Sequence, residues 1–200
     1  DRMIHGMNGR KTLLMAMWLG VFLLGDLFLL YGYDNTWRLW NIPTLSPSFA
    51  DLRAITGAAD SYALGYDPLV YNPGDPWGRK MNYPRIWQVL CALGIDQRYT
   101  VLIGVLFAAL FIAGIFLSLP ETIDNATAYV LLSAVFSPAV LLGIERGNTD
   151  LFIFFLLSIT ISLFSTNSKR LTAAGSASLL LAFMLKLYPL FGSLIIVRRR

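Results

Sequence analysis

Long apolar blocks separated by short polar segments are the feature that most restricts how this chain can fold. Apolar residues make up 56% of the sequence and charged residues only 14%, whereas about a quarter of a typical soluble domain is charged. So little charge would leave a soluble surface uncovered, and blocks of about 20 apolar residues are what a helix needs to cross a bilayer. The sequence therefore predicts an all-α, multi-pass transmembrane helical bundle that forms one membrane domain over residues 1–200.

About five spans are expected from the apolar blocks. They cover residues 12–32, 99–119, 126–144, 150–164 and 171–197. The long polar segment 33–98 is rich in aromatic residues, so we expect short interfacial helices in it, one of them starting after Ser46-Pro47-Ser48. Arg2, Arg10 and Lys11 precede the first span, and the positive-inside rule then places the N-terminus in the cytoplasm and segment 33–98 outside it.

The last apolar block allows two topologies, because Lys186 and Pro189 interrupt it. A straight fifth span would put Arg198-Arg199-Arg200 outside the cytoplasm, against the positive-inside rule. Two half-helices broken near Lys186-Leu187-Tyr188-Pro189 would return the chain to the cytoplasm, and such breaks are tolerated where they line a cavity. Both alternatives stay open from the sequence.

Several classes of chemistry are excluded by the composition. Cys91 is the only cysteine and His5 the only histidine, which rules out a disulfide within the chain, a thiolate cluster, a histidine metal site and a Ser/His triad. No Asp-x-Asp pair is present, so neither a metal nor another cofactor is indicated. No basic stripe is interleaved with aromatic residues in a polar segment, so nucleic acid is not an expected partner.

Three places carry candidate functional residues. Asp51, in the outer segment, is a candidate general base, and its alternative role is to cap a helix. Lys186, inside an apolar block, is a candidate phosphate ligand, with snorkelling or a pair with Asp26 as alternatives. The turn Glu145-Arg146-Gly147-Asn148 falls on the same side as Asp51 in this topology. Arg146 in it is suited to phosphate, and the alternative is a polar helical hairpin turn.

Taken in order along the chain, five motifs resemble those of GT-C-type membrane glycosyltransferases, and most closely those of glycosyltransferase family 87. The matching segments are Phe49-Ala50-Asp51-Leu52, Leu64-Gly65-Tyr66-Asp67-Pro68-Leu69-Val70-Tyr71, Asn82-Tyr83-Pro84-Arg85, Ser137-Pro138 through Gly143-Ile144-Glu145-Arg146-Gly147-Asn148, and Lys186-Leu187-Tyr188-Pro189. Arg85 stands where the family has a second proline. The resemblance covers nearly all 200 residues but only the N-terminal half of a usual member.

The resemblance implies an inverting sugar transfer from a polyprenyl-phosphate-linked donor to an extracytoplasmic acceptor hydroxyl. Asp51 would be the catalytic base, and the implied substrate-binding residues are Arg53, Tyr83, Arg85, Glu145, Arg146, Asn148 and Lys186. The expected partners are membrane lipids, the lipid-linked sugar donor and other proteins of a membrane complex. The expected location is a bacterial cytoplasmic (inner) membrane.

A second hypothesis is a non-catalytic transmembrane subunit of a larger complex, descended from a truncated GT-C fold. In that case the apolar faces matter more than Asp51. A transporter is a third class, which Lys186 and Asp26 within apolar blocks suggest weakly and the large outer segment fits poorly.

Overall fold

A computed structural model describes residues 8–166 and 168–194. Over these residues every regular element is helical, which confirms the predicted all-α class. The elements are α1 (Gly9–Tyr31), α2 (Tyr33–Leu39), α3 (Ala50–Ala63), η1 (Arg85–Gln88), α4 (Val89–Ala92), η2 (Gln97–Tyr99), α5 (Thr100–Ser118), α6 (Asn125–Val135), α7 (Pro138–Arg146), α8 (Asp150–Phe164), α9 (Lys169–Leu185) and η3 (Tyr188–Ser193). They form two compact units, one made of residues 1–44 with 119–142 and the other of residues 45–118 with 143–200.

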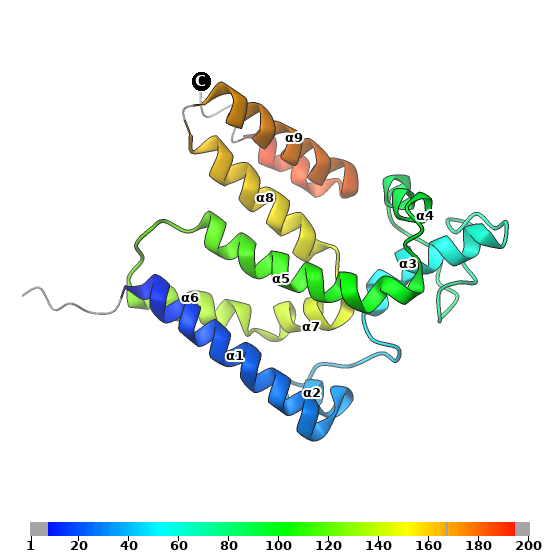
Figure 1. The fold of residues 1–200 in the computed structure, drawn as a ribbon, viewed down its shortest axis with the longest axis horizontal. Coiled ribbons are helices and arrows are strands. Elements are labelled where there is room, and N and C mark those ends of the chain that lie inside the picture. The colour runs from blue at the N-terminus through cyan, green and yellow to red at the C-terminus, as the bar shows by residue number, and fades with distance from the viewer. Residues whose placement is uncertain (1–7, 167, 195–200) are drawn as a thin grey trace, which may run out of the picture. The chain divides into compact units, whose positions relative to one another are not determined.

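In the first unit, α1 and α6 lie side by side (Figure 1). Glycines permit this close approach, because a Cβ at Gly9 would lie 2.3 Å from the carbonyl oxygen of Asp124, and one at Gly20 would lie 2.3 Å from the ring of Phe136. The backbone N–H of Gly9 also donates to the carbonyl of Ile123 over 3.0 Å. The start of α1 is therefore fixed against the segment that leads into α6.

In the second unit, α8 lies between α5 and α9 and packs against both (Figure 1). Small residues at the contacts allow it: Gly114 of α5 faces Phe154 and Ser158 of α8, and Gly175 of α9 faces Phe164. Helix α3 is attached to the start of α5 by a buried hydrogen bond of 2.7 Å between the hydroxyls of Thr56 and Thr100. The hydrogen bond between Thr56 and Thr100 thus holds α3, the helix that carries Asp51, against α5.

Two helices are long and apolar enough to cross a membrane. They are α1 and the continuous helical run Gln97–Ser118 formed by η2 and α5. A third crossing results if α6 and α7, which are bent by 49° at a break, count as one span. Helices α8 and α9 have 15 and 17 residues, fewer than the roughly 20 that a straight crossing needs. The five crossings expected from the sequence therefore stay a prediction.

Two expectations about helix ends can be compared with the structure. Helix α3 begins at Ala50, with Phe49 as its N-cap, shortly after the Ser46-Pro47-Ser48 segment where a short helix was expected to start. Its interfacial position stays a prediction. The last apolar block is interrupted, since α9 ends at Leu185 and η3 begins at Tyr188. A Cβ at Gly192 would lie 3.0 Å from the side chain of Leu179, which shows that η3 packs back against α9.

Proline explains where α9 stops. The carbonyl of Leu185 would normally accept from the N–H four residues later, which belongs to Pro189 and does not exist. Instead the indole N–H of Trp87, a buried side chain of η1, donates to that carbonyl over 3.1 Å. Residues 195–197 of the predicted last span, and the basic residues Arg2 and Arg198 to Arg200 used in the topology argument, lie outside the described residues.

Candidate functional site

The start of α3 is held by the turn that follows α7. The backbone N–H of Phe49 donates to the carbonyl of Glu145 over 3.2 Å, and the N–H of Leu45 donates to its Oε1 over 3.3 Å. Glu145 is fully buried, and its other carboxylate oxygen lies 3.1 Å from Nε of Arg146. Glu145, expected to bind substrate, therefore holds the approach to α3 in place.

Gly147 brings this turn into contact with α3. Its φ is +63°, a left-handed conformation that favours glycine, and a Cβ there would lie 3.0 Å from Cβ of Phe49. The next residue, Asn148, donates from Nδ2 to Oδ2 of Asp51 over 3.2 Å. Two candidates from distant parts of the sequence, Asp51 and Asn148, are thus joined by a hydrogen bond.

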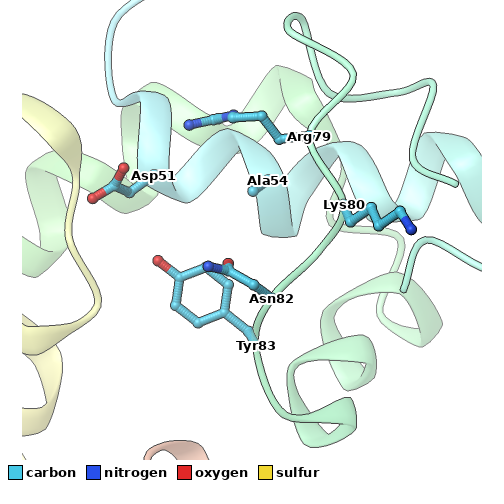
Figure 2. Close-up of a pocket in the computed structure, with 6 residues that line it drawn as sticks. All are labelled: Asp51, Ala54, Arg79, Lys80, Asn82 and Tyr83. Carbon is cyan, nitrogen blue, oxygen red and sulfur yellow. The ribbon is translucent and has the colours of Figure 1, made fainter. Parts of the chain in front are cut away.

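Asp51 faces a cavity of about 220 Å³ beside α3. The cavity is lined by Asp51, Ala54, Arg79, Lys80, Asn82 and Tyr83. Figure 2 shows Arg79 and Tyr83 extending toward Asp51 from the segment opposite α3, whereas Lys80 points away from it. The site therefore combines one carboxylate with two cations, an amide and a phenol.

Arg79 is fixed by a tight turn that closes on Asp75. The buried Asp75 carboxylate accepts from the backbone N–H of Trp77 at 3.1 Å and of Arg79 at 2.9 Å. It also pairs with the Arg79 guanidinium at 3.0 and 2.8 Å. That guanidinium donates to the carbonyl of Ala50 as well, so the cation is tied to the residue before Asp51.

The environment of Asp51 alters its protonation. Burial raises the pKa of Asp51 above the ordinary aspartate range, and the cations Arg146, Arg79 and Lys186 together with the Asn148 hydrogen bond only partly oppose this. Burial, together with the nearby Asp51 charge, also raises the pKa of Tyr83 to about 12. Tyr83 is therefore a neutral phenol at physiological pH, and Asp51 is a stronger base than an exposed aspartate.

Lys186 lies at the end of α9 beside a second carboxylate. Its Nζ is 2.6 Å from Oδ1 of Asp150, which also accepts from the Tyr188 hydroxyl over 3.1 Å. The backbone N–H of Asp150 donates to Oδ1 of Asn148 over 2.9 Å. The Lys186 partner in the structure is thus Asp150 rather than the Asp26 considered above, and Asn148 links this pair to Asp51.

Two predicted binding residues make other contacts. Arg53 donates to the carbonyl of Ser48 at 2.7 Å and to the side chain of Gln97 at 2.7 Å. Arg85 forms an exposed ion pair with Asp67 at 2.8 Å. Neither residue lines the Asp51 cavity.

Two cavity residues escaped the sequence analysis, Arg79 and Lys80, and Asn82 was noted only as part of a motif. A signal for them existed, because two adjacent cations directly precede the Asn82-Tyr83-Pro84 segment. Within the described residues, no three His, Cys, Asp or Glu side chains are grouped closely enough to hold a metal ion.

Fold and site together define an all-helical protein with two or three candidate membrane-spanning helices and a polar cavity around Asp51. Comparisons with protein-family models, with curated proteins and with solved structures find no match.

Proposed function

We propose that this chain is a GT-C-like integral membrane glycosyltransferase, or the N-terminal portion of one, that moves a sugar from a polyprenyl-phosphate donor to an extracytoplasmic acceptor hydroxyl. The observation that carries the proposal is the cavity in which Asp51, with a raised pKa, lies beside Arg79 and Tyr83. A base and a phosphate-binding cation in one small site are the two groups that such a transfer requires.

In the proposed reaction, Asp51 takes the proton of the acceptor hydroxyl. The acceptor oxygen forms a bond to the anomeric carbon as the bond from that carbon to the phosphate oxygen breaks. The electron pair of the broken bond leaves with the polyprenyl phosphate, and the anomeric configuration is inverted. The raised pKa of Asp51 favours proton uptake from the acceptor.

A cation acts on the leaving phosphate. Arg79 is held rigidly by Asp75 and Ala50, so little reorganisation is needed when negative charge develops on the phosphate. Lys80 also lines the cavity, but its side chain points away from Asp51, so Arg79 is the cation assigned to the phosphate. Tyr83 remains protonated and is suited to donate a hydrogen bond to a sugar or phosphate oxygen.

The test is sugar transfer in membranes that contain the intact protein, with polyprenyl-phosphate mannose as the donor probe. Asp51→Asn removes the base at nearly unchanged size, and we expect transfer to fall to background. Asp96→Asn is the matched control, since Asp96 lies in the same predicted outer segment and pairs with exposed Arg98. Transfer at the wild-type rate in Asp51→Asn would refute the catalytic role of Asp51.

A non-catalytic subunit of a membrane complex is the second candidate function. It is favoured by the contacts of Lys186, Arg53 and Arg85, each of which already has a partner within the chain. Under this alternative the wild-type chain transfers no sugar from any polyprenyl-phosphate probe. It also co-purifies stoichiometrically with other membrane proteins, and Asp51→Asn leaves that association intact.

A further inference from the structure

A second cavity lies in the first unit and is independent of the proposed function. Its volume is about 370 Å³, and it is lined by Arg38, Asn41, Ile42 and Pro43. Helix α2 positions it by folding back on the end of α1, where the hydroxyl of Thr36 donates to the carbonyl of Leu27 over 2.9 Å. The cavity therefore sits just beyond the C-terminal turn of a candidate membrane span.

The two polar side chains that line this cavity, those of Arg38 and Asn41, are available to a ligand as far as the described residues show. Within residues 8–166 and 168–194, the Arg38 guanidinium forms no ion pair and the Asn41 side-chain amide no hydrogen bond. The neighbouring Trp37 is 2% exposed, and its indole N–H also has no acceptor in the described part of the chain. The side chains of Arg38 and Asn41 are exposed, so a ligand that supplies acceptors can reach them. Trp37 adds a buried donor, and buried donors are normally satisfied.

The backbone around Asn41 supports the same conclusion. Asn41 has a φ of +54°, a left-handed conformation that asparagine tolerates better than most residues. Strained residues of this kind are common in loops that clamp a ligand. The strain places Asn41 beside Arg38, to whose carbonyl its N–H donates over 2.9 Å.

The surroundings indicate what carries the acceptors. Leu29 and Leu30, on the last turns of α1, are 87% and 76% exposed, and the aromatic residues Tyr31, Tyr33, Trp37 and Trp40 cluster at that end. Apolar side chains followed by tyrosine and tryptophan mark the level at which lipid headgroups lie. An anion with several oxygen acceptors at this level is the phosphate of a lipid headgroup. The acyl chains of that lipid would run along the exposed face of α1.

We infer that the cavity beside α2 binds the phosphate of an anionic phospholipid, with Arg38 pairing with the phosphate and Asn41 donating to its oxygens. Ile42 and Pro43 form the apolar wall against which the glycerol end of the lipid packs.

Native mass spectrometry of the full chain in detergent tests the inference, with phosphatidylglycerol as the probe and diacylglycerol as the phosphate-free comparison. We expect wild-type protein to retain phosphatidylglycerol over diacylglycerol. Arg38→Gln should weaken retention roughly tenfold, because it removes a charge-assisted pair. Asn41→Asp keeps a residue that tolerates the left-handed backbone but adds a negative charge, and it should weaken retention similarly.

Arg170→Gln is the matched control, since it removes one exposed positive charge at the start of α9, in the other unit. Equal retention by Arg38→Gln, Arg170→Gln and the wild type would overturn the site. So would competition by millimolar inorganic phosphate, because the cavity would then bind free phosphate rather than a lipid. Circular dichroism of each variant shows whether it is folded. If Arg38→Gln does not fold, Asn41→Asp still tests the site.

Discussion

Asn148 donates a hydrogen bond of 3.2 Å to Asp51, joining two residues that are 97 positions apart. The same side chain accepts from the backbone N–H of Asp150, whose carboxylate holds Lys186. One amide thus orients the proposed base and connects it to the end of α9.

Loss of the Asn148 amide should shift the pH dependence of transfer. The hydrogen bond lowers the pKa of Asp51, so Asn148→Ala raises that pKa further. Because the base works only when ionised, the acid limb of the pH–rate profile should move to higher pH, with a smaller change at the alkaline plateau. An acid limb at the wild-type position would contradict the role given to Asn148.

Asp51→Asn should abolish activity without lowering the stability of the fold. The pKa of Asp51 is higher in the folded than in the unfolded chain, so its contribution to stability is present below the unfolded pKa and is lost as pH rises through the folded pKa. At a pH above the folded pKa the ionised group opposes folding. We therefore expect Asp51→Asn to unfold at the wild-type temperature or above it, as measured by thermal denaturation in detergent. A clearly lower midpoint would show that the carboxylate stabilises the fold.

Gly147→Ala should loosen the contact between the turn and α3. The left-handed backbone costs a non-glycine residue about 1–2 kcal/mol, and the new Cβ would press on Phe49 at 3.0 Å, which adds about 1–3 kcal/mol. Gly65→Ala is the control, because Gly65 also has a positive φ, +83°, but open space around it. Equal losses of unfolding free energy in the two variants would mean that the turn does not press on α3.

Asp75→Ala should release Arg79. The buried carboxylate accepts four hydrogen bonds, and breaking a buried charged network costs about 3 kcal/mol. Asp96→Ala removes a pair with exposed Arg98 and a local cap of η2, so it should lower the unfolding free energy by less than Asp75→Ala does. Denaturant titration of both variants gives the comparison, and transfer should fall in Asp75→Ala because the cation beside Asp51 is no longer fixed. A small loss in Asp75→Ala, similar to that in Asp96→Ala, would show that the Arg79 clamp is not rigid.

Trp87→Phe should weaken the end of α9. It retains most of the buried ring but deletes the donor to the Leu185 carbonyl, which costs about 1–3 kcal/mol for a buried acceptor left unpaired. Hydrogen exchange should then rise in the last turn of α9. An unchanged exchange rate there would indicate that another donor serves the carbonyl.

Local signals in the sequence were sufficient for several features of the fold. Apolar blocks predicted the helices, the Ser46-Pro47-Ser48 segment predicted the start of α3, and Pro189 was recognised as a possible break. The bounds predicted for the fourth apolar block, 150–164, are those of α8. The last block was predicted over 171–197, but α9 ends at Leu185, because apolar content alone does not show where a helix is broken.

Contacts that depend on long-range packing were not predictable in the same way. Asp51 and Asn148 could be placed on one side of a membrane by topology, but their hydrogen bond depends on the left-handed Gly147 and on buried Glu145. Arg79 was missed because its position is set by Asp75, which reads in the sequence as an ordinary turn residue. Arg53 and Arg85 have the right chemistry for a phosphate, but each pairs with a nearer group.

The indole of Trp87 takes the place of an amide that Pro189 lacks. A residue with an N–H at position 189 would therefore create competition between two donors for the single Leu185 carbonyl. If the N–H of residue 189 formed this hydrogen bond, α9 would lengthen by a turn and Trp87 of η1 would lose its bond to α9. Pro189 thus leaves a carbonyl open to Trp87, and this bond joins α9 to η1, which begins directly after cavity residue Tyr83 and Pro84.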